Sequence, residues 1–343
     1  EIMLVSRRQT LGFLGASAVT PALLAQGVAP KNLITPETKQ AIQRGLAYLA
    51  SRQTEDGGFG NGGNSRDVAI AGLAGMAFMS VGNMPGRGRY GLQVNRCIEY
   101  IVDSARENGF LVAAGSNMHG PMYGHGFATL FLAEAYGMSQ QTDVRPVLAE
   151  AVKLIVNSQN KEGGWRYAPN GTDADISVTI CQVMALRAAK DAGIHVPNET
   201  IDRCVEYVKR SQNPDGGFMY MLSAGGPSAF PRSAAGVVAL YSAGIYKGNE
   251  VNSGIEYLLK QQPEDQGIAH DTHFFYGQYY AVQAMFHAGG ETWQKWYPKI
   301  HGVLTARQKE DGSWFDMICP EYATAMACII LQMPNSYLPI FHR

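Results

Sequence analysis

Residues that could transfer protons or hold a charged group stand just before or at the start of six apolar segments of this sequence. Carboxylates, imidazoles, phenols and a guanidinium are the side chains suited to acid–base chemistry and to binding an anion. If the six segments begin near one another in the fold, these residues form one polar rim. They are Asp67, Tyr123 and His125, Asp173 and Asp175, Arg232, Asp271 and His273, and Glu321 with Tyr322.

The six segments themselves carry almost no charge and are rich in Ala, Gly and Met. Helices of this composition are buried on nearly every side. A more polar, amphipathic pattern precedes each of them, as at 35–53 and 197–213, and predicts a half-exposed helix. The apolar segments are 67–82, 124–138, 175–193, 232–244, 272–290 and 321–334.

A short loop between each exposed helix and the next buried one repeats along the chain. The copies SRQTEDGGF at 51–59, SQNKEGGW at 158–165, SQNPDGGF at 211–218 and ARQKEDGSW at 306–314 carry Gln, an acid, Gly and an aromatic in identical register. Weaker copies begin at Ser104 and Gln262, so the period is about 50 residues, as in repeat architectures. We expect the Gln to cap backbone groups between neighbouring repeats and the aromatic to pack there. Lining a cavity is the alternative for Trp165 and Phe218.

Six hairpins, each of one exposed and one buried helix, predict an all-α domain closed into an α6/α6 toroid, with a straight solenoid as the alternative. We expect the toroid at 31–334. The tail at 335–343 carries apolar side chains that must lie on the body or on a partner subunit in a homo-oligomer. In a toroid the N-terminal ends of all six buried helices meet at one rim, where their positive partial charge suits an anion such as a diphosphate.

Composition narrows the choice of partner. The formal net charge is −1 and Lys and Arg form no long runs, so we expect no nucleic-acid binding and no polybasic membrane patch. A small or apolar partner fits better. The five cysteines, an odd number without CxxC spacing, are expected to be buried free thiols.

Residues 1–30 have the features of an export signal. Arg7 and Arg8 precede an apolar run too short to span a bilayer, which is typical of a bacterial twin-arginine (Tat) signal. The pattern predicts export to the periplasm or cell envelope. The alternative is an amphipathic helix that stays and packs on the body.

The repeated loops, of the form QxxDGxW between alternating outer and inner helices, resemble the QW repeats of the terpenoid cyclase and protein prenyltransferase superfamily over essentially the whole chain after residue 30. The resemblance implies that an isoprenoid or lipid-like small molecule binds in the central cavity. It also assigns Asp175 as a general acid and Asp173 as its partner, as in the squalene-type class II cyclases, with Ile176 in place of a further Asp. A nearby second carboxylate and an apolar pocket keep such an acid protonated.

The prenyltransferase branch of the superfamily binds zinc at the fifth and sixth inner helices. The resemblance places Asp271 and His273 at two of the ligand positions and Ala323 at the third. A catalytic zinc takes three protein ligands. We therefore expect no cofactor, and zinc is the alternative if His270 completes the site.

Several activities remain open from the sequence. Acid-initiated cyclisation of a polyprenyl chain, prenyl transfer, and a non-catalytic lipid-binding or scaffold toroid all fit, and a glycan-processing α6/α6 enzyme is a further alternative. The rim aspartates Asp67, Asp175 and Asp271 are also good helix N-caps. Aromatic walls would stabilise carbocations. The residues expected to contact a substrate are His125, Tyr123, Arg232, Tyr276, Tyr280, Tyr322 and Trp165.

Overall fold

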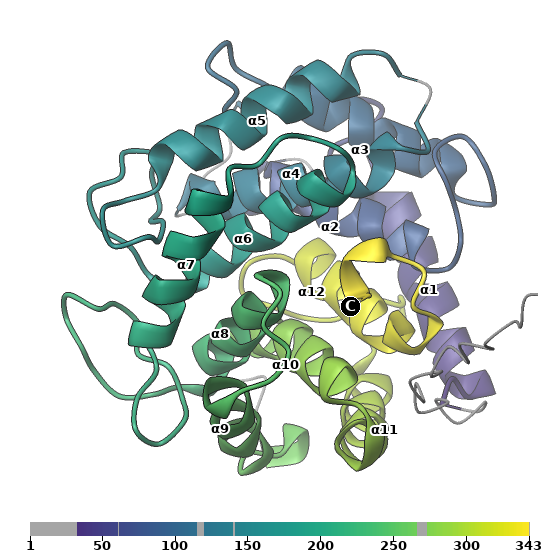
Figure 1. Cartoon of the computed structure of the whole chain (residues 1–343). Helices are drawn as coiled ribbons and strands as arrows, with labels where there is room; N and C mark the ends of the chain where they lie inside the picture. The colour runs from purple at the N-terminus through teal and green to yellow at the C-terminus, as the bar shows by residue number, and fades with distance from the viewer. Residues whose placement is uncertain (1–32, 61, 115–119, 140, 266–272, 343) are drawn as a thin grey trace, which may run out of the picture.

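The computed structural model describes residues 33–60, 62–114, 120–139, 141–265 and 273–342, and these fold into two concentric layers of helices (Figure 1). The described residues contain only isolated β-bridges and no strand. The prediction of an all-α protein is confirmed. The proposed signal segment, residues 1–30, lies outside the described residues.

The inner layer is a closed ring. Each inner helix packs on the next, and the last, α12, packs on the first, α2, which excludes the straight solenoid and confirms the α6/α6 toroid. The inner helices are α2 (Val68–Met79), α4 (Pro121–Tyr136), α6 (Ile176–Asp191), α8 (Phe230–Ser242), α10 (Phe274–Ala288) and α12 (Pro320–Gln332).

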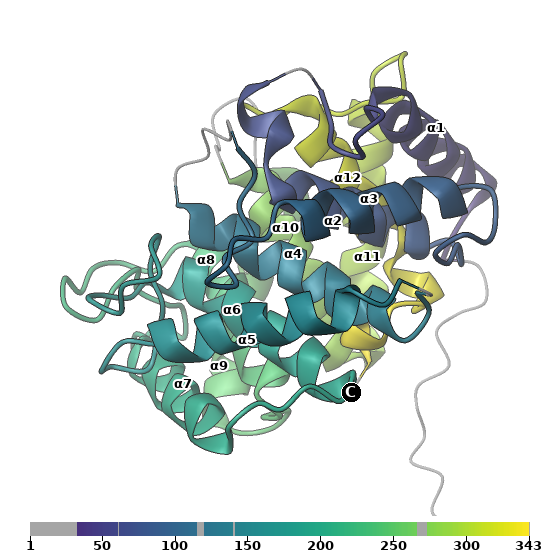
Figure 2. The ribbon, with the colours of Figure 1, turned by 90° about the horizontal axis from the view of Figure 1, so that it is seen from above.

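The outer layer alternates with the inner one along the chain. Figure 1 shows α12, in yellow, against α1, in purple, where the two ends of the ring meet, and Figure 2 shows α5 running along the outside of α4 and α6. The outer helices are α1 (Pro36–Arg52), α3 (Gly91–Asp103), α5 (Val144–Ser158), α7 (Asn198–Arg210), α9 (Asn249–Leu259) and α11 (Gly290–Arg307).

Small residues let the inner helices approach closely. Every residue of α2 is buried. A Cβ added at Gly72 would lie 3.0 Å from the carbonyl oxygen of Phe127, and one at Gly75 would lie 2.3 Å from the ring of Phe131. The Ala- and Gly-rich composition of the inner segments therefore follows from the close packing of α2 on α4.

The glutamine of the repeated loop joins neighbouring outer helices, as predicted. Nε2 of Gln159 donates to the carbonyl of Gly163 in its own loop, at 2.8 Å, and to that of Thr200 on α7, at 2.9 Å. The same two bonds recur in three other copies, from Gln53 to Gly57 and Gln93, from Gln212 to Gly216 and Glu250, and from Gln308 to Gly312 and Ala41. The last pair joins the final loop to α1 and helps to close the ring.

The second repeat differs from the predicted register by one residue. Ala105, not Ser104, pairs with Leu111 in the way that Gln53 pairs with Phe59. Alanine has no side-chain amide to donate, and His125 of α4 links the loop to the next outer helix instead. Its Nδ1 accepts from the N–H of Leu111 and its Nε2 donates to the carbonyl of Ala151 on α5, both at 3.1 Å.

The C-terminal tail lies on the body, over the end of the ring opposite to the predicted polar rim. Leu338, Ile340 and Phe341 are buried, and the N–H of Ile340 donates to Oε2 of Glu134 at the end of α4. Arg187 of α6 donates to the carbonyl of His342 at 2.6 Å. Of the two sequence-based alternatives, the structure shows packing on the body.

Two smaller expectations concern the thiols and the helices. All five cysteines are free, and all except the half-buried Cys319 are fully buried, as expected. Among the described residues, no helix combines the length and hydropathy that a membrane span requires.

Candidate functional site

A cavity of about 550 Å³ opens where the N-terminal ends of the inner helices meet. Its volume is in the range of ordinary small-molecule sites. All six inner helices or their N-caps contribute to the wall, together with the loops that precede them. The described lining residues are Asn64, Ala69, Leu73, Tyr123, Phe127, Tyr167, Ser177, Tyr220, Ala229, Pro231, Arg232, His273, Tyr276, Ile318 and Tyr322.

Tyrosine rings form much of this wall. The ring of Tyr123 lies 6.0 Å from that of Tyr167 and 6.5 Å from that of Tyr276, centroid to centroid. The hydroxyl of Tyr276 donates to the carbonyl of Ser177 at 2.9 Å, which fixes this ring against α6. Burial raises the pKa of Tyr123, Tyr276 and Tyr322 well above 10, so all three stay neutral phenols. Neutral aromatic walls suit an apolar or cationic occupant.

Among the described residues of the cavity wall, the side chain with a permanent charge is a cation. None of the described lining residues is a carboxylate, whereas Arg232 and His273 lie at the starts of α8 and α10. Two carbonyls hold the guanidinium of Arg232: Nε donates to Phe218 at 3.1 Å and Nη2 donates to Pro227 at 2.5 Å. Together with the helix N-termini, Arg232 gives the described part of this wall a positive partial charge.

A polar network stands beside the mouth, centred on Arg166. Its Nη1 donates to Oδ2 of Asp175 at 2.5 Å and to the hydroxyl of Tyr220 at 2.6 Å, while its Nε lies 3.2 Å from Oδ2 of Asp173. The hydroxyls of Tyr220 and Tyr167 are 2.5 Å apart. The guanidinium also stacks 4.0 Å from the ring centroid of Tyr167. Arg166 therefore orders two tyrosines of the cavity wall.

Asp175 is held at the N-cap of α6, behind the wall rather than in it. Its Oδ1 accepts from the N–H of Val178 at 2.8 Å and its Oδ2 accepts from Arg166, so both oxygens are engaged. Burial raises the pKa of Asp175 above its ordinary value, and the bonds from Arg166 and Val178 oppose that rise. Asp173, the predicted partner, has a half-exposed side chain and shares Arg166 rather than bonding to Asp175.

The structure brings most of the predicted contact residues to the cavity. Tyr123, Arg232, Tyr276 and Tyr322 line it, as does His273 from the predicted metal pair. Asp271, the other member of that pair, lies outside the described residues. In the described part of the chain, no three His, Cys, Asp or Glu side chains are grouped as metal ligands would be.

Three predicted contact residues lie elsewhere. Tyr280 lies behind Tyr276, with its hydroxyl 3.3 Å from Sγ of Cys181. Trp165 is buried and its Nε1 donates to the carbonyl of Ile155, so it packs within the repeat. His125 bonds to Leu111 and Ala151 as described above, and burial lowers its pKa to about 4, which keeps it neutral.

The sequence-based selection missed Tyr167, Tyr220, Phe127 and Arg166. A signal for two of them was present in the repeat. Tyr167 and Tyr220 each stand two residues after the loop aromatic, Trp165 or Phe218. Equivalent positions in a toroid face the same rim, so the recurrence of Tyr there indicates a shared position at the mouth.

Family models match two overlapping parts of the chain. The model described as the prenyltransferase alpha-alpha toroid domain matches residues 3–150, and the one described as the squalene-hopene cyclase C-terminal domain matches residues 127–274. A curated relative, drimenyl diphosphate synthase from Streptomyces showdoensis, is 26% identical over 191 residues. That match covers 55% of this chain and spans 34% of the relative.

Solved structures share the fold at low sequence identity. The type II terpene cyclase MstE from Scytonema superposes with a TM-score of 0.62 at 14% identity, covering 88% of this chain and 99% of that one. Cellobiose 2-epimerase from Bacillus thermoamylovorans superposes with a TM-score of 0.64 at 12% identity, covering 87% and 98%. Toroids with different activities thus share this fold. The two family models, each matching less than half of the chain, and the curated relative agree with one another: the chain is similar to the terpenoid cyclase and protein prenyltransferase superfamily, as its repeated loops predicted.

Proposed function

We propose that this toroid binds an isoprenoid or similarly apolar chain in the cavity at the N-terminal ends of its inner helices. The observation that carries the proposal is the lining itself. Leu73, Phe127 and Ile318 supply apolar surface, and Tyr123 and Tyr276 supply ring faces, in a volume suited to a small molecule. Burial of an apolar chain there is favoured in proportion to the area removed from water.

The charge of the wall supports the same occupant. A sugar substrate in a glycan-processing toroid is usually met by a pair of carboxylates, and the described lining contains none. The Scytonema type II terpene cyclase has been determined in complex with geranylgeranyl dihydroxybenzoate, named as its substrate. An isoprenoid therefore suits the apolar wall of this cavity, and the Scytonema enzyme, which has a similar fold, binds a molecule with an isoprenoid chain.

Acid-initiated cyclisation is the second candidate, and Asp175 is the observation that favours it. A buried carboxyl with a raised pKa beside the cavity is the group such chemistry needs. Its two oxygens, however, accept from Val178 and Arg166, and Asp175 is not among the described lining residues. Arg166 would have to move before Asp175 could protonate a bound chain, so we rank binding above cyclisation.

A binding titration with geranylgeraniol tests the proposal. Ala69 lines the cavity, and Ala69→Trp would fill it with a ring; we expect at least a tenfold loss of affinity. Leu92 on α3 is 57% exposed and away from the cavity, so Leu92→Trp is the matched control and should bind as the wild type does. Equal affinities for both variants, or no binding by the wild type, would rule out this cavity as the site.

Incubation with polyprenyl substrates separates binding from turnover. Wild type and Asp175→Asn are compared for products from squalene and from prenyl diphosphates. A product made by the wild type and absent from Asp175→Asn would establish the cyclase. Tight binding without product would establish the non-catalytic toroid.

A further inference from the structure

The cavity occupies only the part of the inner barrel near the N-terminal ends of the inner helices. Its lining residues come from the first two turns of the inner helices: Ala69 and Leu73 on α2, Tyr123 and Phe127 on α4, and single positions such as Tyr322 on α12. No described residue deeper in these helices lines it. The inner helices have 12 to 16 residues, so a large part of the barrel lies below the cavity.

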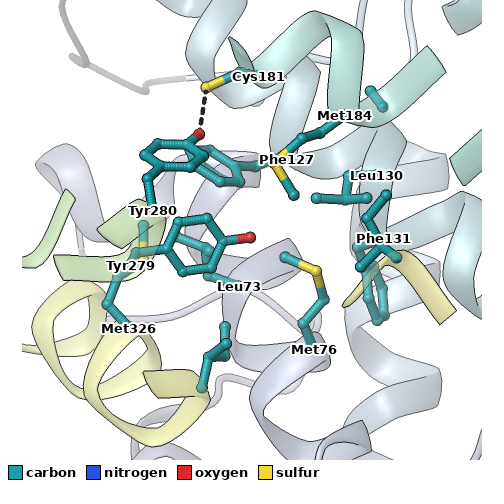
Figure 3. Packing of buried hydrophobic residues seen from close by; sticks show 14 of the residues in the cluster. Leu73, Met76, Phe127, Leu130, Phe131, Cys181, Met184, Tyr279, Tyr280 and Met326 are labelled. Carbon is teal, nitrogen blue, oxygen red and sulfur yellow. Dashed lines mark hydrogen bonds between the residues drawn. The ribbon is translucent and has the colours of Figure 1, made fainter. Parts of the chain in front are cut away.

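A layer of large side chains fills the barrel directly beneath. One turn beyond the lining residues, the inner helices place Met76, Phe131, Cys181, Tyr280 and Met326, all at most 2% exposed. Figure 3 shows this layer with the rings of Phe127, Tyr279 and Tyr280 packed together and the sulfurs of Met76 and Met184 filling the space beside them. Interiors packed in this way leave few voids large enough for a ligand.

Phe127 forms the boundary between the cavity and this layer. Its ring lines the cavity on one side and meets the fully buried ring of Tyr279 edge to face on the other, at a centroid distance of 6.0 Å. Leu73 completes the floor from α2. At the far end of the barrel, the docked tail with Ile340 and Phe341 closes the ring. The cavity is therefore closed at its inner end and does not run through the toroid.

The volume of the cavity limits the length of the chain that it can bury. A cavity of roughly 150 Å³ holds one benzene ring, which corresponds to about 25 Å³ per carbon atom. At that density, the cavity of about 550 Å³ holds about 20 carbon atoms. A chain of up to four isoprene units fits inside, whereas a longer one leaves part of itself in water.

We propose that the floor made by Phe127 and Leu73 acts as a length stop, which restricts the buried part of the ligand to a chain of three to four isoprene units. This inference rests on the proposed function and adds the chain length to it. Each unit added above the stop buries apolar area and raises affinity, and units beyond it bury none.

A length series of prenols tests the stop. Geraniol, farnesol, geranylgeraniol and geranylfarnesol grow by one unit at each step, and their affinities are measured by titration of the tyrosine and tryptophan fluorescence. For the wild type we expect at least a tenfold gain per unit as far as farnesol or geranylgeraniol, and less than a twofold gain afterwards.

Two variants move the stop in opposite directions. Phe127→Ala opens the floor and should move the plateau to a longer prenol, while Ala69→Leu narrows the space above the floor and should move it to a shorter one. Phe131→Ala removes the same ring one turn lower, beneath the floor, and should leave the plateau in place. Circular dichroism melts confirm that each variant is folded, and Ala69→Leu keeps the test valid if Phe127→Ala is not.

The outcomes separate this inference from the function on which it rests. An affinity that continues to rise through geranylfarnesol in the wild type, or a plateau that no folded variant moves, would overturn the length stop and leave chain binding intact. A failure of every prenol to bind would overturn the proposed function itself.

Discussion

Nη1 of Arg166 donates to Oδ2 of Asp175 at 2.5 Å, across a loop that also carries Trp165 and Tyr167. The side chain of Asp175 is fully buried and that of Arg166 is only 20% exposed. This ion pair joins the N-cap of α6 to the tyrosine wall, because Arg166 also bonds to Tyr220. Asp175 therefore has a structural role beyond the N-cap, because its partner Arg166 connects it to the cavity wall.

Removal of Arg166 is expected to destabilise the fold. Arg166→Ala leaves the carboxylate of Asp175 buried without its partner, which costs about 3 kcal/mol in the free energy of unfolding. The exposed pair Lys295 and Glu291 is the control, since Glu291→Gln should cause no measurable change. Urea denaturation measures both. An unfolding free energy unchanged by Arg166→Ala would show that the pair contributes nothing.

Neutralisation of Asp175 should restore part of that loss. In the double variant Arg166→Ala, Asp175→Asn, the buried charge is gone and the amide oxygen can still cap α6 through Val178. We expect the double variant to be more stable than Arg166→Ala alone, by the same denaturation measurement. A double variant that is less stable than the single one would contradict a destabilising unpaired charge.

The glycine of the repeated loop is required by a close contact as well as by its backbone angle. Gly163 has φ +101°, and an added Cβ would lie 2.1 Å from the carbonyl oxygen of Arg203. Gly193 has φ +82° with nothing within 4 Å, so it separates the two effects. We expect Gly193→Ala to cost about 1 kcal/mol from the backbone conformation alone, and Gly163→Ala to cost several-fold more. Thermal melts that show equal losses would contradict the contact.

The tail contact predicts a pH dependence centred on Glu134. Burial raises the pKa of this carboxyl from 4.5 to about 7. Because the folded-state pKa is above the unfolded one, this contribution to stability is fully present below pH 4.5 and is lost as the pH rises through 7. Glu134→Gln removes the ionisation and keeps an acceptor for Ile340. The variant should match the wild type at about pH 4 and be more stable by about 3 kcal/mol at about pH 8.

Other titrating groups near Glu134 are present in both proteins of that comparison. Asp191 further raises the pKa of Glu134, and the bond from Ile340 and the charge of Arg187 lower it. His125, whose pKa burial lowers to about 4, changes stability in the opposite direction over an overlapping range. The difference between wild type and Glu134→Gln, measured by denaturation across the pH range, isolates the carboxyl. A difference independent of pH would contradict the raised pKa.

The ring could be predicted from the sequence because its signal is repeated. Gln159, Gln212 and their equivalents make the same two bonds in four loops, so each copy supported the others. The predicted start of the second repeat differs by one residue from the observed one, because Ala105 lacks the side-chain amide of the glutamine found in the other copies. His125, in the following helix, makes the link instead. When a residue outside the loop makes this contact, the loop sequence itself carries no sign of it.

The site was predicted in part for the same reason. Tyr123, Tyr276 and Tyr322 stand at the start of apolar helices, where periodicity places them at the rim. Arg166 lies in a loop, and the reach of its side chain to Asp175 depends on tertiary packing. The floor at Phe127 also escaped prediction, because an aromatic in an apolar helix looks the same whether it packs in a core or borders a cavity.

Photoaffinity labelling tests the central claim most directly. A geranylgeranyl chain that carries a terminal benzophenone is crosslinked to the full-length protein, and the modified peptides are mapped by mass spectrometry. We predict labels on the inner-helix segments that carry Tyr123 with Phe127, Leu73 and Tyr276, and their loss when unlabelled geranylgeraniol competes. Labels confined to outer surfaces, such as the exposed Met84 and Leu92, would contradict a chain-binding cavity within the ring.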